Sequence, residues 1–402
     1  MRQIEILDTT LRDGEQAPGA VLTAAAKLRL AGALADMGVD AVEAGFPAAS
    51  SEELEAVRGV AREVEGPSIV ALARATDGDV DAAARALAPA KRKRIHVFIS
   101  TSEIHMDRML RMTAGECLER AVRAVRRATE HADEVEFSAQ DATRTDIHFL
   151  LTIFQEAARA GARYINIADT VGYSQPAEFA KLVLAVRGAF AAYNGAPRVS
   201  VHCHNDLGLA VANSLAAVEA GADQVHACVN GIGERGGNAS LEEVAMALRV
   251  RRDHYQADTR VRSEKMVPTS RLYSEITGIA VQPNKAIVGA NAFAHASGIH
   301  QDGVLKDPLN YEIMTPESVG WPARRLVMTK LSGRHGLSAR YDELGIQMDR
   351  TTLDRAYDIA MRRSADSREL DDQALLTIAA EARRVQIELR RAPAGEAVSL
   401  GE

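Results

Sequence analysis

The sequence comprises 402 residues, of which 47% are hydrophobic and 26% are charged, and its formal net charge is −7. This composition is that of a globular protein with a large core, and the negative net charge argues against nucleic acid or an anionic membrane as a partner. The three cysteines, Cys117, Cys203 and Cys228, match neither a zinc-binding spacing nor a disulfide framework, so we expect a reducing, cytoplasmic location.

Short runs rich in β-branched residues alternate with helical stretches through the first part of the chain. The predicted strands are residues 3–8, 39–44, 68–73, 94–100, 133–137, 163–168, 198–202 and 224–229. Segments of helix-forming residues separate them, among them 24–37, 114–131, 149–160 and 209–220, with a last helix at 238–251. Strict alternation predicts a parallel sheet, and eight such units in about 250 residues favour a (β/α)8 barrel over an open doubly wound sheet.

Two segments near the start of the chain bear on location and partners. The chain enters its first predicted strand at once, so we expect neither a signal peptide nor a membrane-spanning segment. The basic run from Lys91 to Arg94 directly precedes an apolar strand, and we interpret it as a solvent-exposed strand entry rather than a nucleic-acid patch.

A second region follows the predicted barrel domain, which we assign to residues 1–255. Residues 256–402 lack another clear strand–helix repeat and predict a mainly helical extension, with helices at 270–277 and 353–362. Between these helices, the glycine-punctuated segment 284–300 is too long for a simple linker. Long ordered loops are usually functional.

His202 and His204 are the most informative feature of the chain. They lie two residues apart at the end of the seventh predicted strand, so both side chains point to one face while Cys203 points away. Two imidazoles presented together form half of a divalent-metal site. The alternative is a pair of histidines whose hydrogen bonds are satisfied by backbone in a polar loop.

Polar residues at other strand ends support the metal interpretation. The carboxyl ends of the strands form the active face of a barrel, where the first and eighth strands are neighbours. Asp13, His202, His204 and the amide oxygen of Asn238 could therefore meet around one ion. This mixed set suits Mn²⁺, Mg²⁺, Co²⁺ or Zn²⁺ without choosing among them. Arg12 would clamp a carboxylate beside the ion, unless it forms a surface salt bridge.

Several blocks resemble the signature sequences of the DRE-TIM metallolyases, and within them those of the 2-isopropylmalate synthases. The blocks are residues 7–16, 43–47, 167–173, 202–208, 230–238, 298–304 and 311–317, and the resemblance covers about residues 3–365. It implies a homodimeric (β/α)8 acyltransferase that condenses acetyl-CoA with a 2-oxo acid and then hydrolyses the thioester. The implied 2-oxo acid is 2-oxoisovalerate, which would place the enzyme in leucine biosynthesis.

The resemblance also implies roles for individual residues. Asp13, His202 and His204 would bind one divalent ion per subunit, with Asn238 in or near the ligand shell. Arg12 and Thr170 would hold the carboxylate of the oxo acid. The implied catalytic residues are Arg12, Glu43, His300 and Tyr311, the last two reaching over the barrel mouth of the partner subunit. The other implied substrate-binding residues are His96, Ser138, Gln140, Asn166 and Glu234.

The chain departs from this family in two places. Gln140 stands where the family usually has a glutamate, and an amide neither acts as a base nor carries charge. Either that glutamate is dispensable or this enzyme accepts a different oxo acid. The sequence after the helical region is also too short to form the C-terminal regulatory domain found in many relatives, so we do not expect feedback inhibition by leucine.

Related functions form the alternatives. Homologous synthases include homocitrate, citramalate, phosphonomethylmalate and aromatic alkylmalate synthases. Lyases of the same barrel family rely on a cysteine in the loop that corresponds to residues 230–238, and no cysteine is present there. A non-catalytic binding module would be expected to lose metal ligands, and all four candidates are intact.

Overall fold

The computed structural model describes residues 1–365 and 369–391. The chain divides into two compact units, which we describe separately. The first contains Met1–Gln282 and Ala286–Val288, and the second contains Pro283–Lys285 and the chain from Gly289 onward. In the part of the chain that the structure describes, none of the helices is both long enough and apolar enough to cross a bilayer.

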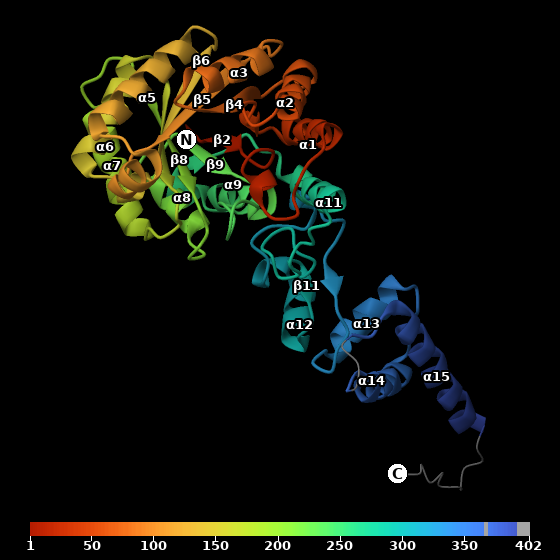
Figure 1. The fold of residues 1–402 in the computed structure, drawn as a ribbon. Helices are drawn as coiled ribbons and strands as arrows, with labels where there is room; N and C mark the ends of the chain where they lie inside the picture. The colour runs from red at the N-terminus through yellow and green to blue at the C-terminus, as the bar shows by residue number, and fades with distance from the viewer. Residues whose placement is uncertain (366–368, 392–402) are drawn as a thin grey trace. The chain divides into compact units, whose positions relative to one another are not determined.

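The first unit is built on a closed barrel of eight parallel strands, which confirms the predicted fold class (Figure 1). The strands are β2 (Glu5–Asp8), β3 (Ala41–Gly45), β4 (Ser68–Arg74), β5 (Lys93–Ser100), β6 (Glu134–Gln140), β7 (Tyr164–Asp169), β8 (Arg198–Cys203) and β9 (Gln224–Ala227). Each strand pairs with the next along the chain, and β9 pairs with β2 to close the sheet. The first and last strand ends therefore lie side by side, as predicted.

Helices connect consecutive strands around the barrel, and one further helix follows the last strand. They are α1 (Ala24–Met37), α2 (Ser51–Glu63), α3 (Asp77–Leu87), α4 (Glu103–His105), α5 (Ala114–Thr129), α6 (Ile147–Arg159), α7 (Pro176–Ala189), α8 (Ala210–Glu219) and α9 (Leu241–Val250). Helix α1 has the bounds that the sequence predicted, because Thr23 caps its first turn by accepting the Ala26 N–H and Gly38 ends it in the left-handed conformation.

Two predicted strands needed correction. The run predicted as one strand at 3–8 is divided, because β1 (Arg2–Gln3) pairs with β10 (Ala257–Asp258) outside the barrel. The strand predicted at 133–137 continues to Gln140 as β6, where its ladder with β5 pairs Ser100 with Gln140. This extension matters for the site, because it places Ser138 within the strand.

The barrel interior is filled largely by polar side chains at every second strand position. Arg94 of β5 donates to Gln224 of β9 at 2.8 Å, and His226 of β9 bonds Glu136 of β6 at 2.8 Å. Because these strands are not neighbours in the sheet, the bonds must cross the barrel interior. The alternate positions, such as Val135, are aliphatic or aromatic and face outward toward the helices.

Arg94 overturns part of the interpretation of the basic run. Lys91 is exposed and pairs with Glu65, as a solvent-exposed strand entry requires. Arg94 instead retains only 2% exposure and bonds both Glu134 and Glu136 at 3.0 Å. A buried guanidinium is stable only with such partners. The prediction of a solvated run was therefore wrong for Arg94.

The first unit continues beyond the barrel through α10 (Arg252–Tyr255), β10 and α11 (Met266–Thr277) to Gln282. Helix α11 packs against α1, so it belongs to the barrel unit.

The second unit is mainly helical, with one short two-stranded sheet. Its helices are α12 (Gly298–Lys306), α13 (Arg334–Glu343), α14 (Arg350–Ser364) and α15 (Asp372–Arg391), and its strands are β11 (Ala294–His295) and β12 (Arg325–Leu326). Leu337, Tyr341, Ile359 and Ile378 lie in its hydrophobic core. The helix predicted at 353–362 corresponds to α14. The segment 284–300 forms turns, β11 and the first turn of α12.

Asp8, the last residue of β2, is a buried carboxyl group below the site. Its oxygens accept the backbone N–H and the hydroxyl of Thr10, each at 2.9 Å. Burial raises the pKa of Asp8 to about 7 in spite of these bonds. The folded protein therefore retains a proton that the unfolded chain loses near pH 4.

This raised pKa predicts a pH-dependent stability. Between about pH 4 and 7 the folded state binds the extra proton, so the free energy of unfolding falls as pH rises, by at most ~1.4 kcal/mol per pH unit from this group. Asp8→Asn removes this titrating group. From pH 5 to pH 8, the free energy of unfolding of the variant should therefore rise by at least ~1 kcal/mol relative to that of the natural protein. Urea unfolding at pH 5 and at pH 8 measures the free energy of unfolding of each protein. Asp253→Asn, at an exposed residue, is the control, and a pH-independent difference for Asp8→Asn would contradict the expectation.

Candidate active site

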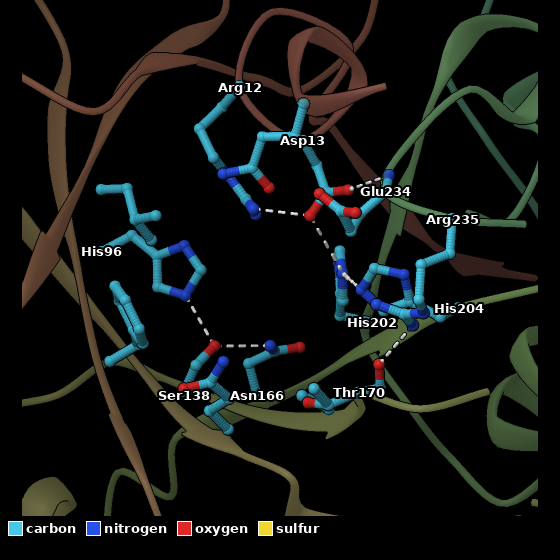
Figure 2. Close-up of a pocket in the computed structure, with 15 residues that line it drawn as sticks. Arg12, Asp13, His96, Ser138, Asn166, Thr170, His202, His204, Glu234 and Arg235 are labelled. Atoms are coloured by element: carbon cyan, nitrogen blue, oxygen red, sulfur yellow. Dashed lines mark hydrogen bonds and ion pairs between the residues drawn. The ribbon is translucent and has the colours of Figure 1, made fainter. Parts of the chain in front are cut away.

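A cavity of about 200 Å³ opens among the carboxyl ends of the barrel strands (Figure 2). Most of the predicted site residues line it: Arg12, Asp13, His96, Ser138, Gln140, Asn166, Thr170, His202, His204 and Glu234. The sequence analysis did not identify the other lining residues, which are Gln16, Leu72, Phe98, Ala168 and Arg235. Glu43 and Asn238 contact residues of this cavity without lining it.

Asp13, His202 and His204 form the metal-binding candidate of the site. Their ligand atoms all lie within 4.8 Å of one another. The Nε2 atoms of His202 and His204 are 3.1 Å apart, and the Asp13 Oδ2 atom lies 3.6 Å from His202 Nε2. Asp13 reaches this point from a tight turn after β2, in which its N–H donates to the carbonyl of Thr9. The i, i+2 spacing of the histidines thus brings both rings together, as predicted.

The charge states of these residues suit a cation. Burial raises the pKa of Asp13, but the positive charge of Arg12, together with the hydrogen bond from the Asn238 amide, outweighs this effect and lowers the pKa well below its usual range. Burial lowers the pKa of both His202 and His204. The carboxylate is therefore ionised and the imidazoles are neutral, which is the form in which they bind metals. Two facing Nε2 atoms share at most one proton, whereas a divalent cation would bind both lone pairs, so these residues fit the ion.

Asn238 lies behind Asp13, in the glycine-rich loop after β9. Its Nδ2 group donates to Asp13 Oδ1 at 2.8 Å, while its Oδ1 atom is buried and has no hydrogen-bond partner among the described residues. The loop must approach closely here, because a Cβ at Gly233 would lie 2.0 Å from Asn238 Nδ2. In this contact, Asn238 orients Asp13 through its amide nitrogen. That the amide oxygen of Asn238 is a fourth metal ligand stays a prediction.

Arg12 bridges two buried carboxylates. Its Nε donates to Glu43 Oε2 and its Nη1 to Asp13 Oδ2, both at 2.6 Å. The Arg12 side chain is 11% exposed and Glu43 is fully buried, so the surface salt bridge considered as an alternative is excluded. Burial raises the pKa of Glu43, but the nearby Arg12 and His96 lower it to about 2. Glu43 is therefore an anion that fixes Arg12 in place.

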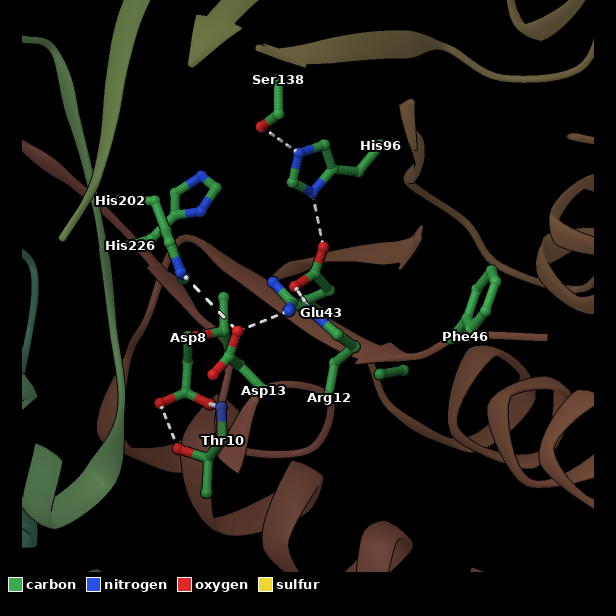
Figure 3. Close-up of polar contacts among 12 residues, drawn as sticks. Asp8, Thr10, Arg12, Asp13, Glu43, Phe46, His96, Ser138, His202 and His226 are labelled. Atoms are coloured by element: carbon green, nitrogen blue, oxygen red, sulfur yellow. Dashed lines mark hydrogen bonds and ion pairs between the residues drawn. The ribbon is translucent and has the colours of Figure 1, made fainter. Parts of the chain in front are cut away.

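A hydrogen-bonded chain continues from Glu43 to the cavity wall (Figure 3). Glu43 Oε1 lies 2.5 Å from His96 Nδ1, and His96 Nε2 lies 2.6 Å from Ser138 Oγ. The Nδ2 group of Asn166 donates to the same Ser138 oxygen at 2.5 Å. Three residues that the sequence analysis placed among the substrate contacts are thus bonded to one another.

Thr170 directly follows β7, and Arg235 lies in the glycine-rich loop after β9. The Thr170 hydroxyl accepts the Asp141 N–H at 2.8 Å, and its carbonyl accepts from Arg235 Nη2 at 2.7 Å. Arg235 also forms a two-pronged ion pair with Asp206, which follows His204 by two residues. Arg235 therefore ties together three strand-end loops. Its place beside Glu234 in the glycine-rich loop was the sequence signal that could have identified it.

Gln140 and Glu234 complete the wall. Gln140 Oε1 accepts the hydroxyl of Ser100, so its amide NH₂ group is the part of the side chain that remains for a ligand. The Glu234 N–H donates to Asp13 Oδ1 at 3.3 Å.

His300 and Tyr311 belong to the second unit. Their rings contact each other edge to face, with centroids 4.4 Å apart. Gly303 permits this contact, because a Cβ there would lie 2.3 Å from the Tyr311 ring. The two predicted catalytic side chains thus form one pair, with Tyr311 45% exposed.

Comparison with known protein families agrees with this architecture. The HMGL-like family matches residues 3–272, and the homocitrate synthase post-HMGL domain-like family matches residues 287–369. Among solved structures, the chain resembles an HMG-CoA lyase from Bacillus subtilis, with a TM-score of 0.60 and 20% identity over 70% of this chain and 96% of that one. Similarity at this level of identity supports the fold alone.

Curated relatives are much more similar in sequence. A 2-isopropylmalate synthase from Nitrosococcus oceani is 53% identical over 95% of this chain and 76% of its own length. A 2-isopropylmalate synthase from Pyrococcus furiosus is 52% identical over 93% of this chain and 76% of its own length.

Proposed function

The chain belongs to the HMGL-like family and, within it, to the 2-isopropylmalate synthases, and from this premise we propose that it condenses acetyl-CoA with a 2-oxo acid and hydrolyses the resulting thioester. The convergence of Asp13, His202 and His204 beside Arg12 is the observation that best supports this proposal. When bound there, a divalent cation supplies Lewis acidity toward the ketone and carboxylate oxygens of the oxo acid.

The residues around this centre have separate tasks in the proposal. Arg12 offers its remaining guanidinium N–H groups to the carboxylate of the oxo acid, and the Thr170 hydroxyl offers a second contact. Glu43 holds Arg12 in that orientation. Removal of a methyl proton from acetyl-CoA falls to the paired His300 and Tyr311, an assignment that rests on the family resemblance and on their ring contact.

The cavity supports 2-oxoisovalerate as the oxo acid. Leu72, Phe98 and Ala168 contribute apolar atoms to its lining. A branched aliphatic substituent would bury its surface there, which is worth about 0.8 kcal/mol per CH₂ group. The product would then be 2-isopropylmalate, with CoA released.

Gln140 supports one alternative substrate class. Because Ser100 occupies the amide oxygen, the amide NH₂ group could donate to a negatively charged substituent, which a glutamate at this position would repel. The alternative is therefore a synthase for an anionic oxo acid such as 2-oxoglutarate.

A panel of 2-oxo acids with acetyl-CoA, monitored by release of the free CoA thiol, tests the proposal. We expect the highest kcat/KM with 2-oxoisovalerate. Gln140→Glu should raise the ratio of kcat/KM for 2-oxoisovalerate over 2-oxoglutarate if the amide contacts the substituent, and should leave it unchanged if it does not. Absence of CoA release with every oxo acid, in the presence of Mn²⁺, Mg²⁺, Co²⁺ or Zn²⁺, would refute the proposed function.

We further propose one divalent ion per subunit, Mn²⁺, Mg²⁺, Co²⁺ or Zn²⁺, and a homodimer in which His300 and Tyr311 serve the partner's barrel. The ion proposal is supported by the mixed nitrogen and oxygen donors. The dimer proposal is supported by the family resemblance. We also propose a role in leucine biosynthesis in the cytoplasm.

A further inference from the structure

Glu43, His96 and Ser138 form a carboxylate–imidazole–hydroxyl chain that begins beneath the cavity and ends in its wall. The three residues come from β3, β5 and β6 and are 0%, 2% and 5% exposed, respectively. Of the three, His96 and Ser138 line the cavity. Both imidazole nitrogens are bonded within the chain, at 2.5 Å to Glu43 and at 2.6 Å to Ser138.

The partners of this chain define the direction in which a proton moves along it. Glu43 is ionised and accepts from Arg12 through Oε2, so its Oε1 atom accepts the His96 Nδ1–H. A neutral His96 then accepts at Nε2, which the Ser138 hydroxyl donates to. Asn166 donates to the Ser138 oxygen, so one lone pair of that oxygen is left for a molecule in the cavity. This arrangement offers a path for a proton from the cavity through Ser138 to His96.

We propose that this chain is the general base for hydrolysis of the thioester, which is the second half of the proposed function and rests on it. A water molecule gives a proton to Ser138 Oγ while the Ser138 proton passes to His96 Nε2. The water oxygen bonds to the thioester carbonyl carbon, and the carbon–sulfur bond breaks. The CoA sulfur receives the stored proton from His96 through Ser138, which restores the chain. The products are a carboxylic acid and the CoA thiol, so the step needs no other reactant.

The charges around His96 support this role. Proton uptake creates an imidazolium, and the Glu43 carboxylate 2.5 Å away stabilises it in the same way that a buried acid stabilises the histidine of hydrolytic triads. Glu43 acts through His96 and is therefore a positioning residue for this step.

A second imidazole–carboxylate pair provides a matched control. His226 bonds Glu136 at 2.8 Å and is as deeply buried as His96, but it does not line the cavity. Its ring contacts those of His96 and His202 edge to face, but among the described residues it has no hydrogen bond to one that lines the cavity. Comparing His226→Gln with His96→Gln therefore separates the effect of losing a buried imidazole–carboxylate pair from the effect of losing the hydrogen bonds that lead to the cavity.

The test separates the two halves of the reaction. Rapid quenching with mass spectrometry follows the condensed CoA thioester, and thiol detection follows CoA release. In Ser138→Ala and His96→Gln we expect the thioester to accumulate, because condensation continues while hydrolysis slows on the order of 100-fold. His226→Gln should accumulate none. Thioester of the condensation product, supplied directly, should be hydrolysed slowly by the first two variants and normally by the control.

Three results would overturn the proposal that Glu43, His96 and Ser138 act as the general base. One is unchanged hydrolysis of the supplied thioester by Ser138→Ala. Another is an equal slowing of condensation and hydrolysis, which would make His96 and Ser138 substrate contacts only. Glu43→Gln keeps a hydrogen-bonding group but loses the charge, so hydrolysis as fast as in the natural protein would also contradict it. Failure of the proposed function is distinct, since the natural protein would then release no CoA with any oxo acid.

Discussion

Replacing His204 with alanine is expected to lower turnover by on the order of 10³-fold or more, with the barrel still folded. The substitution removes one of three ligand atoms that lie within 4.8 Å of one another and leaves Asp13 with a single imidazole. Several kcal/mol of transition-state stabilisation depend on a correctly held cation, and each 1.36 kcal/mol corresponds to about tenfold in rate. The measurements are CoA release with 2-oxoisovalerate and the divalent-metal content of the purified protein.

The matched control is His254→Ala. His254 is also a histidine in an ion pair, at 2.7 Å from Glu219, but it is 51% exposed and lies outside the cavity. We expect it to retain both metal and activity. Full turnover by His204→Ala after treatment with a chelator would refute the metal site.

Replacing Arg12 with lysine should have the second largest effect, a loss of about 100-fold in kcat/KM for the 2-oxo acid. Lysine keeps the positive charge, but its single ammonium cannot bond Glu43 and Asp13 at 2.6 Å each and also fork a carboxylate. Losing one charge-assisted bond of about 1.5–3 kcal/mol corresponds to this range. Steady-state kinetics with each substrate varied in turn give the two values of KM.

Arg74→Lys serves as the comparison for this change. Arg74 forms a similar fork with Asp79, at 2.7 and 3.1 Å, but is largely exposed and outside the cavity. It should leave the kinetics of both substrates unchanged. A change confined to the KM of acetyl-CoA in Arg12→Lys would mean that Arg12 contacts the other substrate.

The sequence was sufficient to predict the barrel and the metal-binding candidate because both depend on local patterns. Alternating runs of β-branched and helix-forming residues identify strands and helices, and eight such units close a barrel. Closure places the end of β2 next to that of β9 and so near the end of β8, and the i, i+2 spacing places the side chains of both histidines at the end of β8 on one face. Asp13 and His202 could therefore be brought together without knowledge of any side-chain packing.

The hydrogen-bonded interior was harder to predict, because it depends on pairs of residues from distant strands. Arg94 stands in a basic run that resembles a surface segment, and its burial is explained by Gln224 from across the barrel together with Glu134 and Glu136 of the neighbouring strand β6. The signal was present in β6, where Glu136, Ser138 and Gln140 alternate with apolar residues. Such alternation in a strand covered by helices indicates a polar barrel interior rather than a solvent-exposed face.

The contact between Glu43 and His96 likewise joins β3 to β5 across an intervening strand. From the sequence, Glu43 was expected to be a catalytic group and His96 a substrate contact. The connection between them depends on how β3 and β5 face each other across the barrel interior. The apolar lining of Leu72 and Phe98 was missed for the same reason, since both residues read as ordinary strand positions.

Leu72, Phe98 and Ala168 have a consequence for how this protein could diverge. Their side chains touch the cavity but take no part in the hydrogen bonds that join Arg12, Glu43, His96 and Ser138. Selection could therefore alter the size of the accepted substituent one position at a time, through intermediates that keep the reacting groups intact. A lineage with this barrel could explore new substrates by gradual drift, without first losing its chemistry.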